Sequence, residues 1–153
     1  MLLRFILDIS HFRRDYLKGG LQRKGLDPDP IQQFNAWFEQ ARITDIADPT
    51  AMVLATVSAD GQPSQRSVLL KYFDTNGFVF FTNYGSRKAT EIAGNSKVSL
   101  LFVWLELERQ IIISGTASRV STADSARYFM SRPKDSTPVI SPPGLRSETI
   151  RTW

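Results

Sequence analysis

The sequence predicts a mainly β protein, an antiparallel barrel that is closed or nearly closed and flanked by helices. From residue 51 onward, segments rich in β-branched and aromatic residues follow one another with short turns between them. Asp60 with Gly61, and Asn76 with Gly77, are turn dipeptides that join the first three segments as hairpins. Five such strands in an open sheet would leave exposed edges, so we expect closure.

The strand segments that we expect are "AMVLATVS", "PSQRSVLLKYF", "FVFFTN", "KVSLLFVWL" and "ERQIIISGTASRV". A helix precedes them, because Asp29 supplies an N-cap, Pro30 fits the first turn, and apolar residues follow at helical spacing. A short helix is predicted near 86–94, and another begins at Ser121 and ends at Pro133. The apolar face of the first helix consists of Ile31, Phe34, Trp37, Phe38 and Ala41.

The 153 residues are enough for one domain with a real core. Residues 11–28 are basic and punctuated by glycines, which predicts an N-terminal arm over residues 1–28. Residues 29–136 carry the barrel. Residues 137–153, "TPVISPPGLRSETIRTW", show no sustained period, so we expect an aberrant or disordered tail there.

The charge balance favours anionic partners, since the chain carries a formal net charge of +4. Nucleic acid, acidic lipid and phosphorylated small molecules all remain open at this point. The chain has no cysteine and one histidine, His11, which argues against disulfides and metal centres and fits a cytoplasmic location. Arg4 and Asp8 interrupt the apolar opening, so we expect neither a signal peptide nor a membrane span.

Three cationic clusters are candidates for binding: the ends of "RSVLLK" (Arg66–Lys71), Arg87 with Lys88, and Arg132 with Lys134. Each one alone is explained equally simply by solvated surface charge. In the first cluster, strict strand alternation puts Arg66 and Lys71 on opposite faces. One ligand can contact both side chains only if a bulge intervenes, if the side chains reach around the end of the strand, or if two subunits share the site.

Arg87 and Lys88 lie at the start of the predicted short helix, where the macrodipole favours anions. Adjacent cations repel each other there, and a bound anion would remove that cost. Backbone N–H groups and cationic side chains can hold a phosphate together. Ser86 serves equally well as a ligand hydroxyl or as a helix cap.

A second phosphate site is suggested by Tyr128 and Arg132, which are four apart on one helix, and by Ser136 after the proline stop. Tyr128 alone also fits a half-packed helix residue. Gln110 offers an amide donor and acceptor to a heteroaromatic ring, or is a surface glutamine. No catalytic triad, carboxylate pair or nucleotide-binding loop is present, so in an enzyme a cofactor must carry the chemistry.

Several segments, in order, closely resemble the pyridoxamine 5'-phosphate oxidase family. They are "HFRRDYLKGGL", "ADPTAMVLATVSADGQPSQRSVLLKYFDTNGFVFFTNYGSRKATEI", "VSLLFVWLELERQ" and "YFMSRPKDS". The resemblance implies an antiparallel split barrel of the Greek-key type and a homodimer with FMN at the subunit interface. A site built from two chains would use both faces of the strand that carries Arg66 and Lys71.

The resemblance also implies the contacts of each ligand, with no catalytic residue identified and no metal. The FMN contacts would be Arg66, Ser67, Val68, Leu69, Leu70, Lys71, Phe81, Thr82, Arg87, Lys88 and Gln110. The substrate contacts would be Lys71, Tyr128, Arg132 and Ser136, with Arg13, Arg14, Asp15 and Tyr16 of the arm closing over the site.

The family chemistry implied is oxidation of pyridoxamine or pyridoxine 5'-phosphate to pyridoxal 5'-phosphate. A hydride leaves the C4' carbon of the substrate for the flavin, and oxygen reoxidises the flavin to give hydrogen peroxide. The protein would act mainly by positioning, because it holds two phosphates so that ring faces ring.

The resemblance ends at Ser136, beyond which the family's later active-site segment is not recognisable. Phe81 also stands where a tyrosine is common in the family. The proline-rich ending suggests a change of reading frame and an early stop. We therefore expect impaired stability, FMN retention and turnover.

Two other functions remain alternatives. One is a split-barrel protein that holds flavin or pyridoxal phosphate without oxidising anything. The other is a small barrel that binds nucleic acid, although the cations gather at strand and helix ends rather than along one groove.

Overall fold

A computed structural model of the chain describes residues 9–12, 15, 20–83, 85–120 and 145–152. The strands are β1 (Ala51–Val57), β2 (Pro63–Asp74), β3 (Gly77–Asn83), β4 (Lys97–Trp104), β5 (Arg109–Arg119) and β6 (Leu145–Thr152). The helices are α1 (Pro30–Ile43), α2 (Arg87–Gly94) and two short 3₁₀ turns, η1 (Arg23–Gly25) and η2 (Leu105–Leu107). The predicted helix between Ser121 and Pro133 lies outside the described residues.

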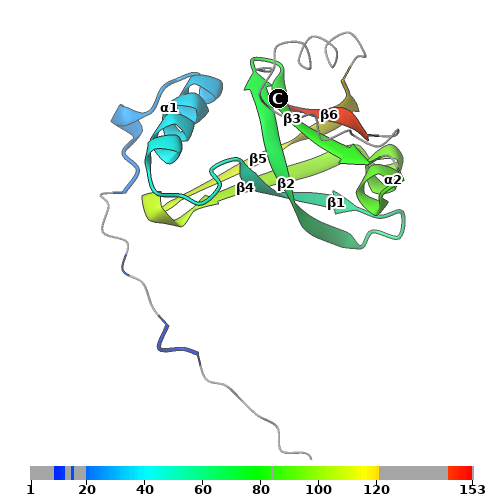
Figure 1. Ribbon diagram of the computed structural model, residues 1–153, viewed down its shortest axis with the longest axis horizontal. Coiled ribbons are helices and arrows are strands. Elements are labelled where there is room, and N and C mark those ends of the chain that lie inside the picture. Colours follow the sequence, from blue (N-terminus) through cyan, green and yellow to red (C-terminus); the bar gives the residue numbers. More distant parts are fainter. Residues whose placement is uncertain (1–8, 13–14, 16–19, 84, 121–144, 153) are drawn as a thin grey trace, which may run out of the picture.

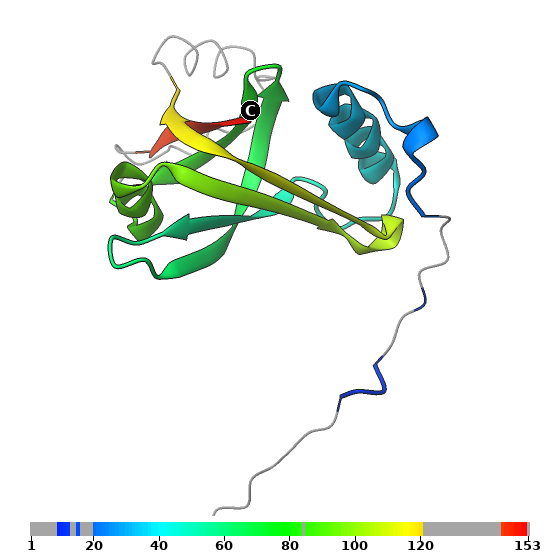
Figure 2. The ribbon, with the colours of Figure 1, turned by 180° about the vertical axis from the view of Figure 1, so that it is seen from behind.

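The strands form a closed antiparallel barrel in the order β1-β2-β3-β6-β5-β4 (Figures 1 and 2). One hairpin joins β1 to β2 and a second joins β2 to β3, and β4 pairs with the other edge of β1. The resulting order β4-β1-β2-β3 is a Greek key. The predicted fold class is confirmed.

The two predicted hairpin turns are also present. Gly61 in the β1–β2 turn has φ of 84° and Gly77 at the start of β3 has φ of 135°, a region that L side chains rarely adopt. The glycines therefore allow both reversals at the points that the sequence indicated.

Closure of the barrel differs from the prediction, because it depends on a sixth strand from the segment expected to be a disordered tail. β6 pairs with β3 on one side, from Phe78↔Ile150 to Asn83↔Leu145, and with β5 on the other. Without β6, two strands would present unpaired backbone edges. Strand pairing uses backbone N–H and C=O groups, so "LRSETIRT" can close the barrel without an apolar alternation.

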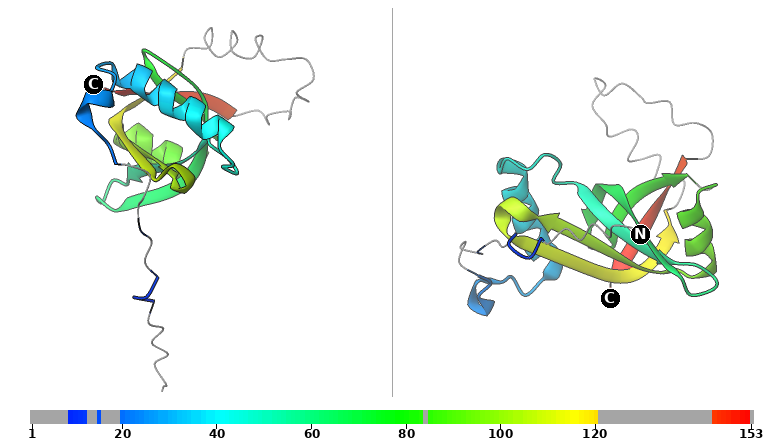
Figure 3. Two further views of the ribbon diagram at one scale, coloured as in Figure 1. Left: turned by 90° about the vertical axis from the view of Figure 1, so that its left-hand side faces the viewer. Right: turned by 90° about the horizontal axis from the view of Figure 1, so that it is seen from below.

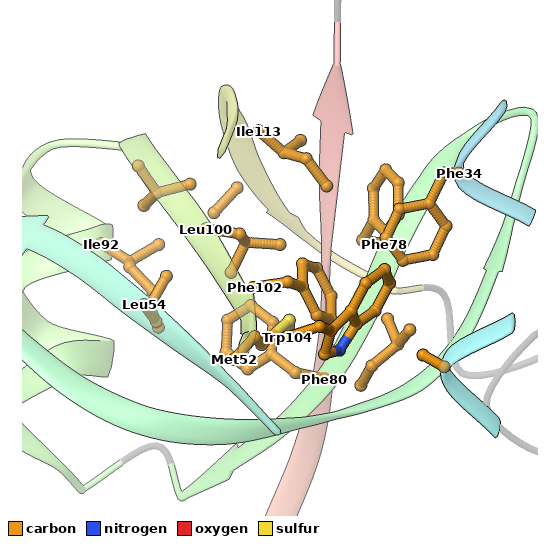
Figure 4. Packing of buried hydrophobic residues seen from close by; sticks show 14 residues of the cluster. Phe34, Met52, Leu54, Phe78, Phe80, Ile92, Leu100, Phe102, Trp104 and Ile113 are labelled. Carbon is orange, nitrogen blue, oxygen red and sulfur yellow. The ribbon is translucent and has the colours of Figure 1, made fainter. Parts of the chain in front are cut away.

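Helix α1 closes one end of the barrel and supplies an aromatic side chain to the core. Its N-cap is Asp29, whose carboxylate accepts a hydrogen bond from the Ile31 N–H at 2.8 Å. Phe34 is 3% exposed, and its ring centroid lies 4.8 Å from those of Phe73 and Phe78, in edge-to-face contacts. Figure 4 shows Phe34 among the buried rings of the barrel strands. The predicted apolar face of α1 is confirmed, since its other members pack against the same core.

Helix α2 lies between β3 and β4 in the chain and covers the opposite end of the barrel from α1 (Figure 3, right). Its residues Ala89 and Ile92 are buried. This placement brings the start of α2, with its adjacent cations, next to the inner face of β1 and β2. Among the described residues, no helix is long and apolar enough to cross a membrane.

Candidate phosphate-binding site

A buried carboxylate, Glu91 on α2, lies at the centre of the candidate site. It is 6% exposed and accepts hydrogen bonds through its Oε2 atom from the hydroxyls of Thr56 on β1 and Ser64 on β2. The same oxygen lies 3.1 Å from Nη2 of Arg66, and Oε1 lies 2.7 Å from Nε of Arg87. One carboxylate therefore joins two of the predicted ligand cations.

The hydrogen bonds from Thr56 and then from Ser64, followed by those from Arg87 and Arg66, lower the pKa of Glu91 from 4.5 to about 2. Each of these donors favours the ionised form, and together they outweigh the effect of burial. Glu91 is therefore an anion at neutral pH. The repulsion expected between bare cations at the start of α2 is relieved by an anion of the chain itself.

Arg66 lies on the inner face of β2, and its guanidinium is engaged on several sides. Its Nη atoms donate to the Leu54 carbonyl, to the Thr56 and Ser64 hydroxyls, and to Glu91. The side chain is 21% exposed. Arg66 consequently ties β1, β2 and α2 together, and its predicted contact with FMN remains a prediction.

Arg87, the first residue of α2, is arranged differently from Arg66. Its Nε donates to Glu91, while its side chain is 68% exposed. Among the residues that the structure describes, no hydrogen bond is made by its Nη atoms. The outer edge of this guanidinium can therefore hold two oxygens of one ligand.

The start of α2 provides further donors. Ser86 is the N-cap, and its hydroxyl accepts from the Ala89 N–H at 3.4 Å. Capping, one of its two predicted roles, is therefore observed, while ligand contact remains a prediction. The N–H groups of Arg87 and Lys88 belong to the first turn, where helical amides have no intrahelical acceptor. Thr82, buried at the end of β3, places its hydroxyl 3.3 Å from that of Ser86.

A surface hollow of about 390 Å³ lies beside these groups, between α2 and the β1–β2 turn. Arg87, Thr90 and Glu91 line one side, and Ser58 and Ala59 line the other. The exposed guanidinium of Arg87 therefore borders an open depression.

The strand that carries Arg66 has an irregularity, and a bulge is one of the three arrangements by which one ligand could contact both Arg66 and Lys71. The pairing of β2 with β3 shifts register between Leu70 and Tyr72, so Lys71 lies at the shift. Before this point β2 alternates as predicted: Arg66, Val68 and Leu70 are half-buried or buried, while Ser67 and Leu69 are exposed. Lys71 is half-buried.

Phe81 of β3 is half-buried and pairs with Ser147 of β6. A ligand that contacts the backbone of Phe81 would therefore have to approach a strand that is already paired with β6 on this side. Its side chain faces away from the interior that Phe80 and Thr82 occupy.

Gln110 is not brought to the other predicted FMN contacts. It is exposed near the start of β5, opposite Val103 of β4. Its neighbour Arg109 donates to Gln40 of α1 and lies over the Trp37 ring at 5.0 Å. Gln110 is therefore at the α1 end of the barrel, and Arg87 is at the α2 end.

The predicted substrate contacts are mostly outside the described residues. Arg13, Arg14, Tyr16, Tyr128, Arg132 and Ser136 are in this group. Asp15 is described and exposed. Residues 9–12 of the arm lie away from the barrel in Figures 1 and 2.

Sequence reasoning missed Glu91. Its spacing of four from Arg87 is a signal for a helical ion pair. No local sequence pattern predicts its contacts with Arg66, 25 residues earlier, and with Thr56, 35 residues earlier.

Comparison with known families shows a match of residues 38–145 to the family described as pyridoxamine 5'-phosphate oxidase. The chain is 56% identical over 130 residues to the pyridoxine/pyridoxamine 5'-phosphate oxidase of Teredinibacter turnerae, covering 85% of this chain and 62% of that protein. It is 58% identical over 129 residues to the same-named protein of Shewanella frigidimarina, covering 84% and 61%. The chain thus spans about three fifths of the length of these relatives.

Solved structures share the fold. PhzG from Burkholderia lata, in complex with tetrahydrophenazine-1-carboxylic acid, superposes with a TM-score of 0.74 at 21% identity, covering 88% of this chain and 82% of that one. A pyridoxamine 5'-phosphate oxidase-related, FMN-binding protein from Nostoc punctiforme gives 0.59 at 18% identity, with 81% of each chain covered. The heme storage protein HutZ from Vibrio cholerae gives 0.53 at 17%, covering 78% of this chain and 88% of that one. At these identities the likeness is one of fold.

Proposed function

Because the chain belongs to the pyridoxamine 5'-phosphate oxidase family, we propose that it binds FMN and that its chemistry is oxidation of pyridoxamine or pyridoxine 5'-phosphate with O₂ as acceptor. FMN supplies the acceptor for the hydride that leaves the substrate's C4' carbon. The residues of this chain bind and orient the two phosphorylated molecules.

The observation that carries this proposal is the donor set at the start of α2. The exposed edge of Arg87 and the first-turn N–H groups of α2 lie at the same helix end, and Lys88 is the next residue of that turn. A phosphomonoester carries about two negative charges at neutral pH and prefers such a combination of charge and amide donors. The FMN phosphate is the ligand group that we place here.

Several of the remaining predicted FMN contacts belong to β2. Lys71 lies at the β2 bulge, and Ser67 and Leu69 lie on the outer face of β2. The isoalloxazine ring would extend along this face from the anchored phosphate. Tyr128, Arg132 and Ser136 would hold the substrate phosphate, with Arg13, Arg14, Asp15 and Tyr16 of the arm covering it.

We further propose that two copies of the chain share each site. Gln110 lies at the far end of the barrel from Arg87, so a ligand that touches both needs the second from a partner. The outer face of β2, β4 and β5 carries exposed apolar side chains. Leu69 is 42%, Val103 is 45% and Ile112 is 62% exposed. Apolar exposure of this kind favours burial against a second copy.

A second candidate function is a flavin- or pyridoxal phosphate-binding protein without oxidase activity, since solved proteins of this fold include one described as FMN-binding and one described as a heme storage protein. A flavin-loaded chain that forms no hydrogen peroxide would support this second function.

The experiment is to purify the chain, add FMN, remove unbound flavin and record the visible spectrum, then add pyridoxamine 5'-phosphate and measure peroxide. Retained flavin with peroxide supports the oxidase, and retained flavin without peroxide supports the binding protein. Loss of all flavin on desalting, at protein concentrations well above micromolar, would contradict both.

A further inference from the structure

The carboxylate of Glu91 divides its two oxygens between two arginines with different surroundings. Oε2 faces inward and meets Thr56, Ser64 and Arg66, while Oε1 meets only Nε of Arg87 among the described residues. Glu91 itself is 4% exposed in its side chain. The barrel thus fixes the carboxylate through Oε2, and Oε1 holds the exposed side chain of Arg87.

From this division we infer that Glu91 is a positioning residue for ligand phosphate, because it fixes the guanidinium of Arg87 through Nε and leaves the Nη edge for the anion. This inference rests on the proposed function. It adds a residue that contacts no ligand and acts through Arg87.

Fixing Arg87 matters because its side chain is 68% exposed. A free arginine has many rotamers, and a ligand that orders it must overcome that entropy. An acceptor at Nε, 2.7 Å away and itself buried, orders the guanidinium before the ligand arrives. The barrel therefore determines where the Arg87 fork lies.

The charge of the cluster also suits a phosphate. Arg66, Arg87 and Lys88 contribute three positive charges, while Glu91 and Asp60, which interacts electrostatically with Arg87, contribute two negative charges. The cluster therefore keeps a net charge of one positive, which attracts a phosphomonoester that carries about −1.5 to −2 near neutral pH.

If Glu91 instead competed with phosphate for Arg87, its removal would change FMN affinity in the opposite direction. Removing a competing anion would strengthen binding of FMN, whereas removing a positioning acceptor weakens it. The direction of the change therefore separates the two. The buried position of Glu91 favours positioning, because the barrel fixes its carboxylate through Oε2 and so holds Oε1 at Nε of Arg87.

The test uses the full chain and three variants of one residue. Glu91→Ala removes the acceptor. Glu91→Asp keeps the charge and withdraws the carboxylate by one methylene, so its oxygen no longer reaches Nε. Glu91→Gln removes the charge and keeps an oxygen for Nε, while its amide group takes the place of Oε2 and faces Nη2 of Arg66. Glu39→Ala is the matched control, since Glu39 pairs with Arg42 on α1 and both are exposed.

FMN affinity is measured by quenching of flavin fluorescence, and the Arg87 Nε–H is followed by NMR as its exchange with water in the FMN-free chain. We expect about tenfold weaker FMN binding in Glu91→Ala and Glu91→Asp, the scale of a charge-assisted hydrogen bond. Glu91→Gln should stay within about threefold of the unaltered chain, like Glu39→Ala. In an Arg87→Ala background, Glu91→Ala should have no further effect on affinity.

Each outcome decides one question. Unchanged or tighter FMN binding in the folded Glu91→Asp chain overturns the positioning role and leaves FMN binding intact. A Glu91→Ala effect that persists in full without Arg87 also overturns it. If the unaltered chain binds no FMN, the proposed function fails, and the phosphate role of Glu91 fails with it. In that case, slow exchange of the Arg87 Nε–H that is lost in Glu91→Asp would still show the Glu91–Arg87 clamp as a structural feature.

Discussion

The Thr56 hydroxyl on β1 donates to the carboxylate of Glu91 on α2, across 35 residues of sequence. Both residues are buried, at 0% and 6% exposure. This contact joins the helix that carries the candidate phosphate site to the barrel wall. The position of α2 is therefore set by a polar contact as well as by Ala89 and Ile92.

Replacing Thr56 by valine should destabilise the chain and loosen α2. The substitution keeps the shape and removes the donor, which leaves a buried acceptor with one fewer partner. We expect the midpoint of thermal unfolding to fall by roughly 5 °C or more. Circular dichroism during heating measures this, and Thr90→Val, at an exposed position of α2, is the control. Equal midpoints for the two variants would contradict the role of Thr56.

The stability of the chain should depend on Glu91 in acid. The hydrogen bonds from Thr56 and Ser64 lower the pKa of Glu91 from 4.5 to about 2 in the folded chain. A group with a lowered folded pKa stabilises the protein above its unfolded pKa, and this stabilisation is lost as pH falls toward the folded value. The loss should occur between pH 4.5 and about 2.

Urea unfolding at pH 6, 4 and 3 measures this dependence. Glu91→Gln should be less stable than the unaltered chain at pH 6, and the difference should shrink as pH approaches 3. A difference that stays constant over this range would show that the ionised carboxylate is not the stabilising form.

Phe34→Ala should separate α1 from the barrel. Phe34 is 3% exposed and contacts the rings of Phe73, Phe78 and Phe102. Truncation of a buried phenylalanine costs about 3–5 kcal/mol. Ile43→Ala on the same helix, at a residue that is 86% exposed, should change the free energy of unfolding by less than about 0.5 kcal/mol. Denaturant titration of both variants checks the contrast.

Ile112→Asp should weaken self-association if two copies share each site. Ile112 lies opposite Leu101 on the outer face of the β4–β5 pair and is 62% exposed. A carboxylate there would be buried without a partner in the dimer. Sedimentation velocity should show a dimer for the unaltered chain and for Ile43→Asp, and a monomer for Ile112→Asp. A monomer in all three samples contradicts the shared site.

Much of the fold follows from local patterns in the sequence. Asp29 and Pro30 begin α1, and Gly61 and Gly77 mark the hairpins, because these residues determine local backbone conformation. β6 was missed because its pairing is set by the open edges of β3 and β5 and not by its own side-chain pattern. β6, with the sequence "LRSETIRT", shows that unpaired strand edges can pair with a segment whose side chains do not alternate clearly.

The candidate site was predicted in part. The cations Arg66 and Arg87 were singled out, and the structure joins them. Glu91 joins them, and its spacing of four from Arg87 is the local signal that was missed. Its contacts with Thr56 and Ser64 have no such signal, because they arise from the packing of α2 on the barrel. A bulge was one of three arrangements considered for Arg66 and Lys71; the structure shows a register shift of β2 against β3 at Lys71, and contact of one ligand with both side chains remains a prediction.

Calorimetric titration of the chain with FMN, and separately with riboflavin, tests the central claim that the cations at the start of α2 hold a phosphate. The two ligands share the ring system and differ by the phosphate group. FMN should bind at least about 100-fold more tightly than riboflavin, and Arg87→Ala should reduce that ratio by about tenfold or more. Equal affinity for the two ligands, or no heat with FMN, would contradict the claim.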